Sequence, residues 1–414
     1  MKDASSKPLK DIRVLDFTRV LSGPFCTALM ADMGAEVIKI EPLDGDDYRH
    51  VPPYKKGESA FFLLMNRGKK SLSVNLKSES GKALVRAIAA QSDVVVENFK
   101  PGVTKRLGVD YDSLKIDNRK LVYASISGFG QEGPSAGNAA YDIIVQAASG
   151  LMQATGFEGQ PPTLVGEAFA DLTAGLFASW AVLVALFHRT RTGEGQYIDV
   201  AMFDCLLSML PTSIAQFCYG GHLPIRTGDR HPISVPFGTF RARDGYFVLA
   251  VLNQSLFDRL LEVIGRPDLK TAAALTGDLR RSENEPLVRS LIESWSGDRT
   301  VEEVLVRLSE KKVPAGPIWT IEQALNSSNE SRRQVLPSVF HPDLGMISVL
   351  EQPVFFSGVE RGIAMPPPRL GEHSEAVLGA LCGISPDAFK HLVAEGVVGA
   401  IPRPSAQQTA SEKI

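Results

Sequence analysis

The sequence predicts an α/β protein with a parallel, doubly wound sheet in a large domain and a second, smaller α+β domain. Strand and helix patterns alternate through the first 126 residues, and a hairpin with three amphipathic helices follows near the middle. The chain has 414 residues, more than one hydrophobic core usually serves. We therefore expect two domains.

The first elements form one βαβ unit. A strand is expected over 12–17, a helix runs from Pro24 to a closing Gly34, and a second strand covers 36–40. Proline in the first turn and glycine at the end are typical helix boundaries. Two strands joined by a helix in this way imply a parallel pair with a right-handed crossover.

The same alternation continues to residue 200. A helix is expected over 81–91, and strands over 93–97, 121–126 and 196–200. A loop rich in Gly, Pro, Ser and Ala, residues 127–170, interrupts it, and such long loops often carry function. The apolar run Leu172–Phe187 is expected to be a buried helix, because it is shorter than the ~20 residues that span a bilayer.

The second half predicts the smaller domain. Strands over 238–242 and 246–251 flank an Asp244-Gly245 turn, which is a hairpin signal. Helices are expected over 256–264, 285–295, 301–311 and 374–381, with short strands at 347–350 and 354–356. The predicted limits are 1–218 for the N-terminal part of the large domain, 219–235 for a linker, 236–315 for the small domain, 316–404 for the return to the large domain, and 405–414 for a disordered tail.

The composition and the missing motifs argue against several classes of function. The net charge of −3 does not favour nucleic acid or a membrane surface as a partner. The four cysteines are scattered, which argues against zinc and disulfides and for a reduced, cytoplasmic protein. Residues 1–10 have no apolar leader. Dinucleotide, P-loop, H-E-x-x-H and G-x-S-x-G motifs are missing, so neither a metal nor a redox cofactor is expected.

Asp171 is the main candidate for chemistry. It directly precedes the apolar run that begins at Leu172, where a carboxylate serves either as a helix cap or as a nucleophile at a dry helix start. Basic residues also follow the strands, in a predicted turn over 66–70 and in the segment from Asn98 to Arg106. Such residues beside a helix start can hold a pyrophosphate, although a solvated basic loop looks the same.

Taken together, the ordered motifs resemble the class III coenzyme A transferases, a family that also contains the 2-methylacyl-CoA racemases. The resemblance covers nearly the whole chain. It rests on Val14–Pro24, Gly34–Glu41, Val96–Gly102, Ser127–Gly130, Tyr141-Asp142, Asp171 and Thr192–Val200. It implies a Rossmann-like large domain formed by both chain ends, an inserted small domain, and an interlocked homodimer.

The resemblance also implies a site. The catalytic aspartate of the family falls on Asp171, and Tyr141 lies near the thioester. The CoA contacts fall on Val20, Leu21, Val74, Lys77, Asn98, Phe99, Lys100, Arg106 and Leu107. A family arginine that contacts CoA is replaced by Pro42, and Arg49, Lys69 or Lys70 are the expected substitutes. Arg19, Arg49 and Arg226 are candidates for binding a distal carboxylate of the acid.

The implied activity moves CoA between two carboxylic acids, through an aspartyl anhydride and an aspartyl-CoA thioester, with no cofactor beyond CoA. Backbone N–H groups of the 127–137 loop are candidate oxyanion donors. Tyr141 replaces the acid/base histidine of the racemases, which disfavours racemization. Leu21 replaces a glutamine of the formyl-CoA:oxalate branch, so a dicarboxylate other than oxalate, with succinyl-CoA as donor, is expected. Transfer within one dicarboxylyl-CoA, a 2-methylacyl-CoA racemase or isomerase, and a CoA-binding scaffold without activity remain alternatives.

Overall fold

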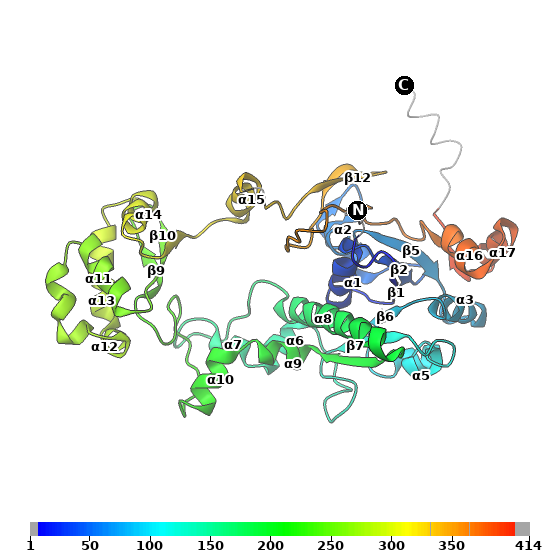
Figure 1. The fold of residues 1–414 in the computed structure, drawn as a ribbon, viewed down its shortest axis with the longest axis horizontal. Helices are drawn as coiled ribbons and strands as arrows, with labels where there is room; N and C mark the ends of the chain where they lie inside the picture. Colours follow the sequence, from blue (N-terminus) through cyan, green and yellow to red (C-terminus); the bar gives the residue numbers. More distant parts are fainter. Residues whose placement is uncertain (1–6, 332, 364, 402–414) are drawn as a thin grey trace, which may run out of the picture. The chain divides into compact units, whose positions relative to one another are not determined.

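The computed structural model describes residues 7–331, 333–363 and 365–401, and these fall into two compact units (Figure 1). The first takes its described residues from Met1–Ser149, Gly166–Met209 and Ser331–Ile414, and the second from Gly150–Val165 and Leu210–Glu330. The predicted domain limits stay predictions. The predicted tail over 405–414 lies outside the described residues.

The first unit is built on a seven-stranded, mostly parallel sheet, as the sequence predicts. Its order is β14-β5-β2-β1-β6-β7-β8, and β14 is antiparallel to its neighbour β5. The strands are β1 (Arg13–Asp16), β2 (Glu36–Glu41), β5 (Lys69–Val74), β6 (Val94–Glu97), β7 (Val122–Ser127), β8 (Tyr197–Ala201) and β14 (Val398–Gly399). In the parallel register Leu15 lies opposite both Ile38 and Val95. These positions are fully buried because helices cover the sheet.

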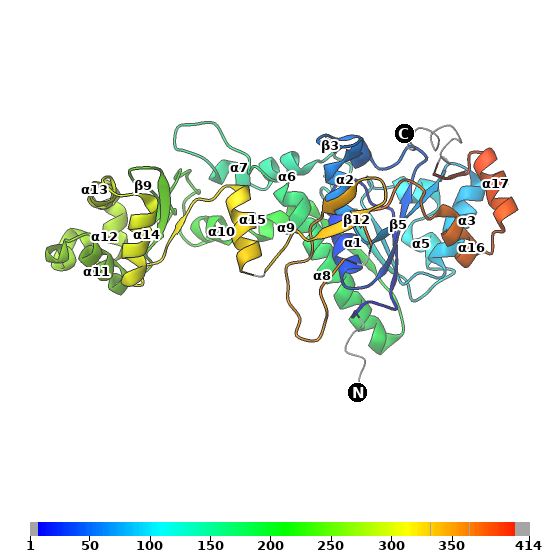
Figure 2. The ribbon, with the colours of Figure 1, turned by 90° about the horizontal axis from the view of Figure 1, so that it is seen from above.

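Helices cover both faces of this sheet. On one face lie α1 (Ser22–Asp32) and α8 (Phe169–Thr192), and on the other lie α3 (Glu79–Ala89), α16 (Ser374–Cys382) and α17 (Pro386–Ala394) (Figures 1 and 2). Side chains alternate along β1, so Leu15 and Phe17 pack into the core beneath α3 and α16. The shorter elements that matter for the site are η1 (Asp47–His50), α2 (Ala60–Met65), α4 (Val103–Leu107) and α6 (Asp142–Ala148).

The second unit has its own core. The predicted hairpin is confirmed as β9 (Phe237–Arg241) and β10 (Tyr246–Ala250), joined by β11 (Ala315–Pro317). Phe247 and Leu249 of β10 are fully buried. The predicted helices are observed as α11 (Gln254–Val263), α13 (Glu285–Ser296) and α14 (Val301–Glu310), and the remaining α-helices of the unit are α7 (Leu151–Ala154), α10 (Pro211–Cys218), α12 (Asp278–Glu283) and α15 (Ile321–Glu330).

Several local predictions are wrong or only partly correct. The basic turn predicted over 66–70 is limited to residues 67 and 68, because Lys69 and Lys70 belong to β5 and form ion pairs, Lys69 fully buried and Lys70 about a third exposed. Residues 354–356 form no strand. The strand predicted at 347–350 is β13 (Gly345–Ser348), and it pairs with an unpredicted β12 (Ser338–His341). Helix α17 and strand β14 were also not predicted.

Helix α8 is longer than predicted. By length and apolar composition it could cross a membrane, but a core helix meets the same criteria, and half of its most apolar window is buried. It packs against α1 and β7. Its N-terminal end, which lies beside α1, positions the candidate site.

Candidate active site

The loop between β1 and α1 has a strained backbone. Val20 has a φ of +66°, a left-handed conformation that is costly for a β-branched residue and often marks a functional site. Two side chains hold the loop in place. Asp46 Oδ1 accepts the Val20 N–H at 3.0 Å, and the Asn98 amide bonds both the N–H and the C=O of Arg19 at 2.8 Å.

Two fully buried ion pairs lie beneath this loop. Lys39 Nζ is 2.7 Å from Asp46 Oδ2, and Lys69 Nζ is 3.0 Å from Asp16 Oδ2. Burial alone would raise the pKa of Asp16, but Lys69 and Lys39 hold that pKa below its usual value. Lys39 also donates to the Thr18 carbonyl at 2.7 Å. Removing one partner would leave a buried charge uncompensated, so the pairs fix one arrangement of the loop.

The three cations predicted to replace the arginine missing at Pro42 all form ion pairs within the protein, and their contact with CoA stays a prediction. Lys69 is fully buried against Asp16, and Lys70 pairs with Glu36 at 2.6 Å. Arg49 forms two hydrogen bonds to Glu41, at 2.8 and 2.9 Å. Arg49 is for the same reason unsuited to bind a substrate carboxylate.

Asp171 is not the cap of its helix. Helix α8 begins at Phe169, its N-cap position is Ala168, and Asp171 is the third helical residue. The capping acceptor is Asp142, whose Oδ1 accepts the N–H of Ala170 at 2.7 Å and that of Asp171 at 3.3 Å. Gln146 Nε2 donates to the other Asp142 oxygen at 2.7 Å. The helix start is thus satisfied without the Asp171 carboxylate, which is left available for chemistry.

The surroundings make the Asp171 carboxylate more basic. Burial, and then the negative charge of Asp142, raise the pKa of Asp171 to about 6, while hydrogen bonds from Ser22 act in the opposite direction. Asp171 is therefore ionized at neutral pH and is a better nucleophile than an ordinary carboxylate. Burial and the charge of Asp171 in turn raise the pKa of Tyr48 to about 12, so Tyr48 keeps its proton.

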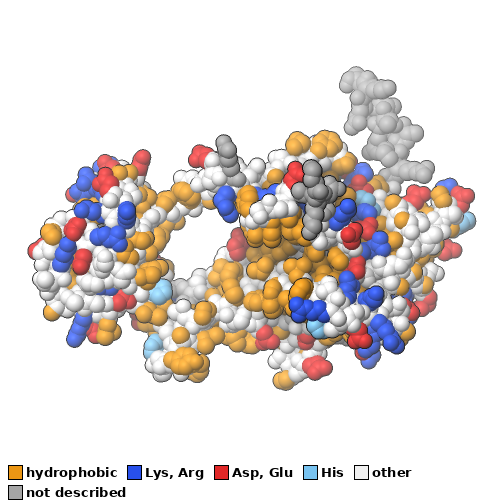
Figure 3. Space-filling model, in the orientation of Figure 1, with side chains coloured by type: hydrophobic (Ala, Val, Ile, Leu, Met, Phe, Trp, Pro, Cys, Tyr) orange, Lys and Arg blue, Asp and Glu red, His pale blue; other side chains and the backbone are white. Residues whose placement is uncertain are grey.

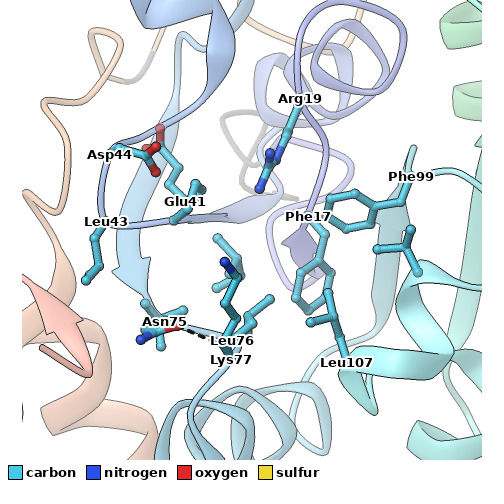
Figure 4. Close-up of a pocket in the computed structure, with 14 residues that line it drawn as sticks. Phe17, Arg19, Glu41, Leu43, Asp44, Asn75, Leu76, Lys77, Phe99 and Leu107 are labelled. Carbon is cyan, nitrogen blue, oxygen red and sulfur yellow. Dashed lines mark hydrogen bonds between the residues drawn. The ribbon is translucent and has the colours of Figure 1, made fainter.

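Two cavities with lining residues in common lie at this end of the sheet, and Asp171 lines one of them. The first, of about 480 Å³, lies at the carboxyl ends of β1, β2 and β5 (Figure 4). The second, of about 290 Å³, contains Asp171 and Ser22. Arg19 and Phe99 line both, and the Arg19 guanidinium lies 5.5 Å from the centre of the Phe99 ring. The crevice at the strand ends is the usual ligand position in open α/β sheets.

The structure brings most of the predicted site residues together. Val74, Lys77, Phe99 and Leu107 line the first cavity, and Val20, Asn98, Phe99, Lys100 and Tyr141 line the second with Asp171. Leu21 and Arg106 line neither. Leu21 is buried at the N-cap of α1, and Arg106 is exposed in the last turn of α4. The Gly128 end of the predicted oxyanion loop also lines the second cavity.

Sequence reasoning missed Ser22, Asp46 and the role of Asp142. One signal was present for the buried charges, because Lys39 lies between Ile38 and Ile40 in the apolar centre of a strand. No local signal marks Asp142 as the cap of a helix that begins 27 positions further along. Among the described residues, no group of three or more His, Cys, Asp or Glu side chains could hold a metal ion.

A buried carboxylate with a raised pKa, beside cavities at the strand ends of an open α/β sheet, is typical of an enzyme active site, and the comparisons identify the family. A family model described as "CoA-transferase family III" matches residues 9–374. That match covers well over half of the chain, so this protein belongs to the class III CoA-transferases and is a CoA-transferase.

Characterized relatives are similar over most of their length. An acetyl-CoA:oxalate CoA-transferase of Acetobacter aceti is 39% identical over 89% of this chain and 95% of its own. A succinyl-CoA:glutarate CoA-transferase of Mus musculus is 36% identical over 95% and 91%. A CaiB/BaiF family protein of Brucella suis has a solved structure that matches with a TM-score of 0.81 and 34% identity, over 91% of this chain and 100% of that one.

Proposed function

We propose that this protein transfers CoA from succinyl-CoA, or another dicarboxylyl-CoA, to a dicarboxylic acid, with Asp171 as the covalent nucleophile. One observation carries the proposal. The Asp171 carboxylate is relieved of capping by Asp142 and lies in a cavity that shares Arg19 and Phe99 with a larger cavity. A nucleophile at the end of a long, partly apolar crevice suits an acyl-CoA thioester.

The two cavities suit the two ends of CoA. We assign the nucleotide end to the larger cavity, where Phe99, Leu107 and Val74 offer apolar surface. Arg19 and Lys77 are the cations that line this cavity, and neither has an ion-pair partner recorded among the described residues. We assign these two side chains to the phosphates, because phosphate recognition favours a free cation. The thioester end then extends past Phe99 toward Asp171.

The chemistry proceeds in two exchanges. A carboxylate oxygen of Asp171 attacks the acyl carbon, the C–S bond breaks, and CoA leaves as the thiolate. The thiolate attacks the Asp171 carbonyl carbon of the resulting anhydride, which releases the donor acid and leaves an aspartyl-CoA thioester. The acceptor carboxylate attacks this thioester to form a second anhydride and the thiolate. Attack of that thiolate on the acceptor acyl carbon gives the new acyl-CoA and frees Asp171.

The names of the relatives support a dicarboxylate substrate. Relatives at 34–37% identity are described as transferring CoA from succinyl-CoA to citramalate, glutarate or mesaconate. The relative at 39% identity is described as acting on oxalate, so the expectation against oxalate stays a prediction. We further propose that the protein acts as a homodimer in the cytoplasm.

The proposal is tested by incubating the protein with succinyl-CoA and one acid at a time, and by identifying the products by mass. We expect a new acyl-CoA and free succinate with a dicarboxylate such as glutarate or mesaconate, and less product with acetate. Oxalate tests the prediction drawn from Leu21. Asp171→Asn should retain CoA binding and the helix start but lose at least ~10³-fold in rate, because an amide is a poor nucleophile.

Other outcomes would identify the alternatives. Deuterium uptake at the α-carbon in D₂O without any acceptor would indicate a racemase. Rearrangement of a dicarboxylyl-CoA without an added acid would indicate intramolecular transfer. CoA binding with no transfer to any acid would contradict the proposal and leave a binding protein.

A further inference from the structure

Ser22 is the residue that contacts the Asp171 carboxylate from a second helix. It is the first residue of α1 and is 3% exposed, and it lines the same cavity as Asp171. Its carbonyl lies against Gly175, one turn after Asp171 in α8, and donation from its hydroxyl and its backbone N–H lowers the pKa of Asp171. The N–H is one of the groups that a helix start leaves without an intrahelical acceptor. Two donors from one residue therefore point at the atoms that would react.

The direction of the Ser22 hydroxyl is set by Asn98. Asn98 Nδ2 donates to Ser22 Oγ at 3.3 Å, which occupies an acceptor position of that oxygen. A hydroxyl carries a single proton, and that proton is then free to point to Asp171. Asn98 cannot easily turn away, since the same amide also bonds the backbone of Arg19 on both sides.

Close packing of two helices brings Ser22 within reach. A Cβ at Gly175 of α8 would lie 2.4 Å from the Ser22 carbonyl oxygen, so only glycine allows α1 to approach this closely. A Cβ at Gly23 would lie 2.2 Å from the Thr18 side chain. Gly175 therefore lets the first turn of α1 pack against α8, and Gly23 lets the same turn lie against Thr18.

We propose that the Ser22 hydroxyl is a catalytic group that stabilizes the oxyanion formed on the Asp171 carbonyl. This inference rests on the proposed function. When the thiolate attacks the Asp171 carbonyl carbon of the anhydride, the C–S bond forms and the C=O electron pair moves to the oxygen. Collapse of this intermediate expels the donor carboxylate. Donors already aimed at that oxygen stabilize the developing charge without reorganization.

The same contact has a different effect before the reaction begins. A hydrogen bond to the ionized carboxylate favours the ionized form, and Ser22 accordingly opposes the rise in the pKa of Asp171. Loss of the hydroxyl should therefore slow the chemical step and also move the acid limb of the pH–rate profile to higher pH. A residue that merely supported the fold would do neither.

The experiment compares Ser22→Ala with Ser22→Thr, because both keep the backbone N–H and only threonine keeps the hydroxyl. We expect Ser22→Ala to lower kcat by ~10- to 100-fold with little change in KM for acyl-CoA, somewhat less than the loss for a sole oxyanion donor. Ser22→Thr should recover most of the rate. Ser92→Ala is the matched control, since the Ser92 hydroxyl is also buried but bonds only the Ile88 carbonyl at 2.8 Å.

Wild-type kcat and an unchanged pH profile in a folded Ser22→Ala protein would overturn the inference. An equal loss of kcat in Ser22→Ala and Ser22→Thr would also contradict a catalytic role for the hydroxyl. Borohydride trapping of the wild-type protein separates this failure from failure of the proposed function. If Asp171 is trapped while Ser22→Ala is fully active, only the inference about Ser22 fails. If wild-type protein turns over without trapping at Asp171, the proposed function fails.

Discussion

Asp142 and Asp171 are two carboxylates at one helix start with different roles. Asp142 accepts the free N–H groups of α8, and Asp171 faces the cavity. The division matters because helix N–H groups and Gln146 occupy both Asp142 oxygens, whereas the Asp171 carboxylate lines the cavity where a substrate could reach it. At the scale of residues, the position of Asp171 before an apolar run could be read from the sequence. Its release from capping could not, because Asp142 belongs to another helix.

This pair predicts the pH dependence of activity. Asp171 attacks as the carboxylate and its pKa is raised to about 6, so the rate should rise with pH through about 6 and then level off. Asp142→Asn removes the second cause of that raised pKa, and the acid limb should move to lower pH. A pH profile of kcat/KM for acyl-CoA measures this.

The control variant is Asp142→Ala. Asparagine can still accept the helix N–H groups, whereas alanine cannot, so only alanine should lower stability, by about 1 kcal/mol. An acid limb that stays in place in Asp142→Asn would argue against Asp171 as the titrating nucleophile.

At the scale of elements, the predictions that succeeded rest on local patterns. The β1–α1–β2 unit and the β9–β10 hairpin lie where the spacing of apolar residues and the turn residues predict them. Helix α8 extends beyond its apolar run because Arg189 and Arg191 lie in its last turn and Gly193 adopts the left-handed conformation that ends it.

The failures occurred where tertiary contacts decide the structure. The turn predicted over 66–70 looks solvated in the sequence, but Lys69 and Lys70 pair with Asp16 and Glu36 and belong to β5. Strand β14 has two residues and depends on pairing with β5. The strained Val20 likewise depends on Asp46, a residue 26 positions away. A contact with a residue far along the chain cannot be predicted from a local sequence pattern.

At the scale of the whole molecule, α8 leaves a large apolar surface uncovered. Leu176, Trp180, Leu183, Val184 and Phe187 are each 44–61% exposed. In Figure 3, hydrophobic side chains gather in the region where α8 lies in Figure 1. Apolar patches of this kind usually mark an interface, and they support the proposed homodimer.

A charge placed in this patch should disrupt the dimer. We expect the wild-type protein to be a dimer by light scattering, and Trp180→Glu to shift it toward monomer, because a buried unpaired carboxylate is costly at an interface. Ile116→Glu is the control, since Ile116 is 74% exposed and lies outside α8. A monomeric wild-type protein would contradict the proposed dimer.

The central claim is that Asp171 carries the CoA during turnover. The most direct measurement is peptide mass spectrometry after incubation with succinyl-CoA and reduction with borohydride, which converts an aspartyl thioester to homoserine. We predict conversion at position 171, dependent on succinyl-CoA and absent in Asp171→Asn. Continued CoA transfer with an unmodified Asp171, or with the modification on another residue, would contradict the account.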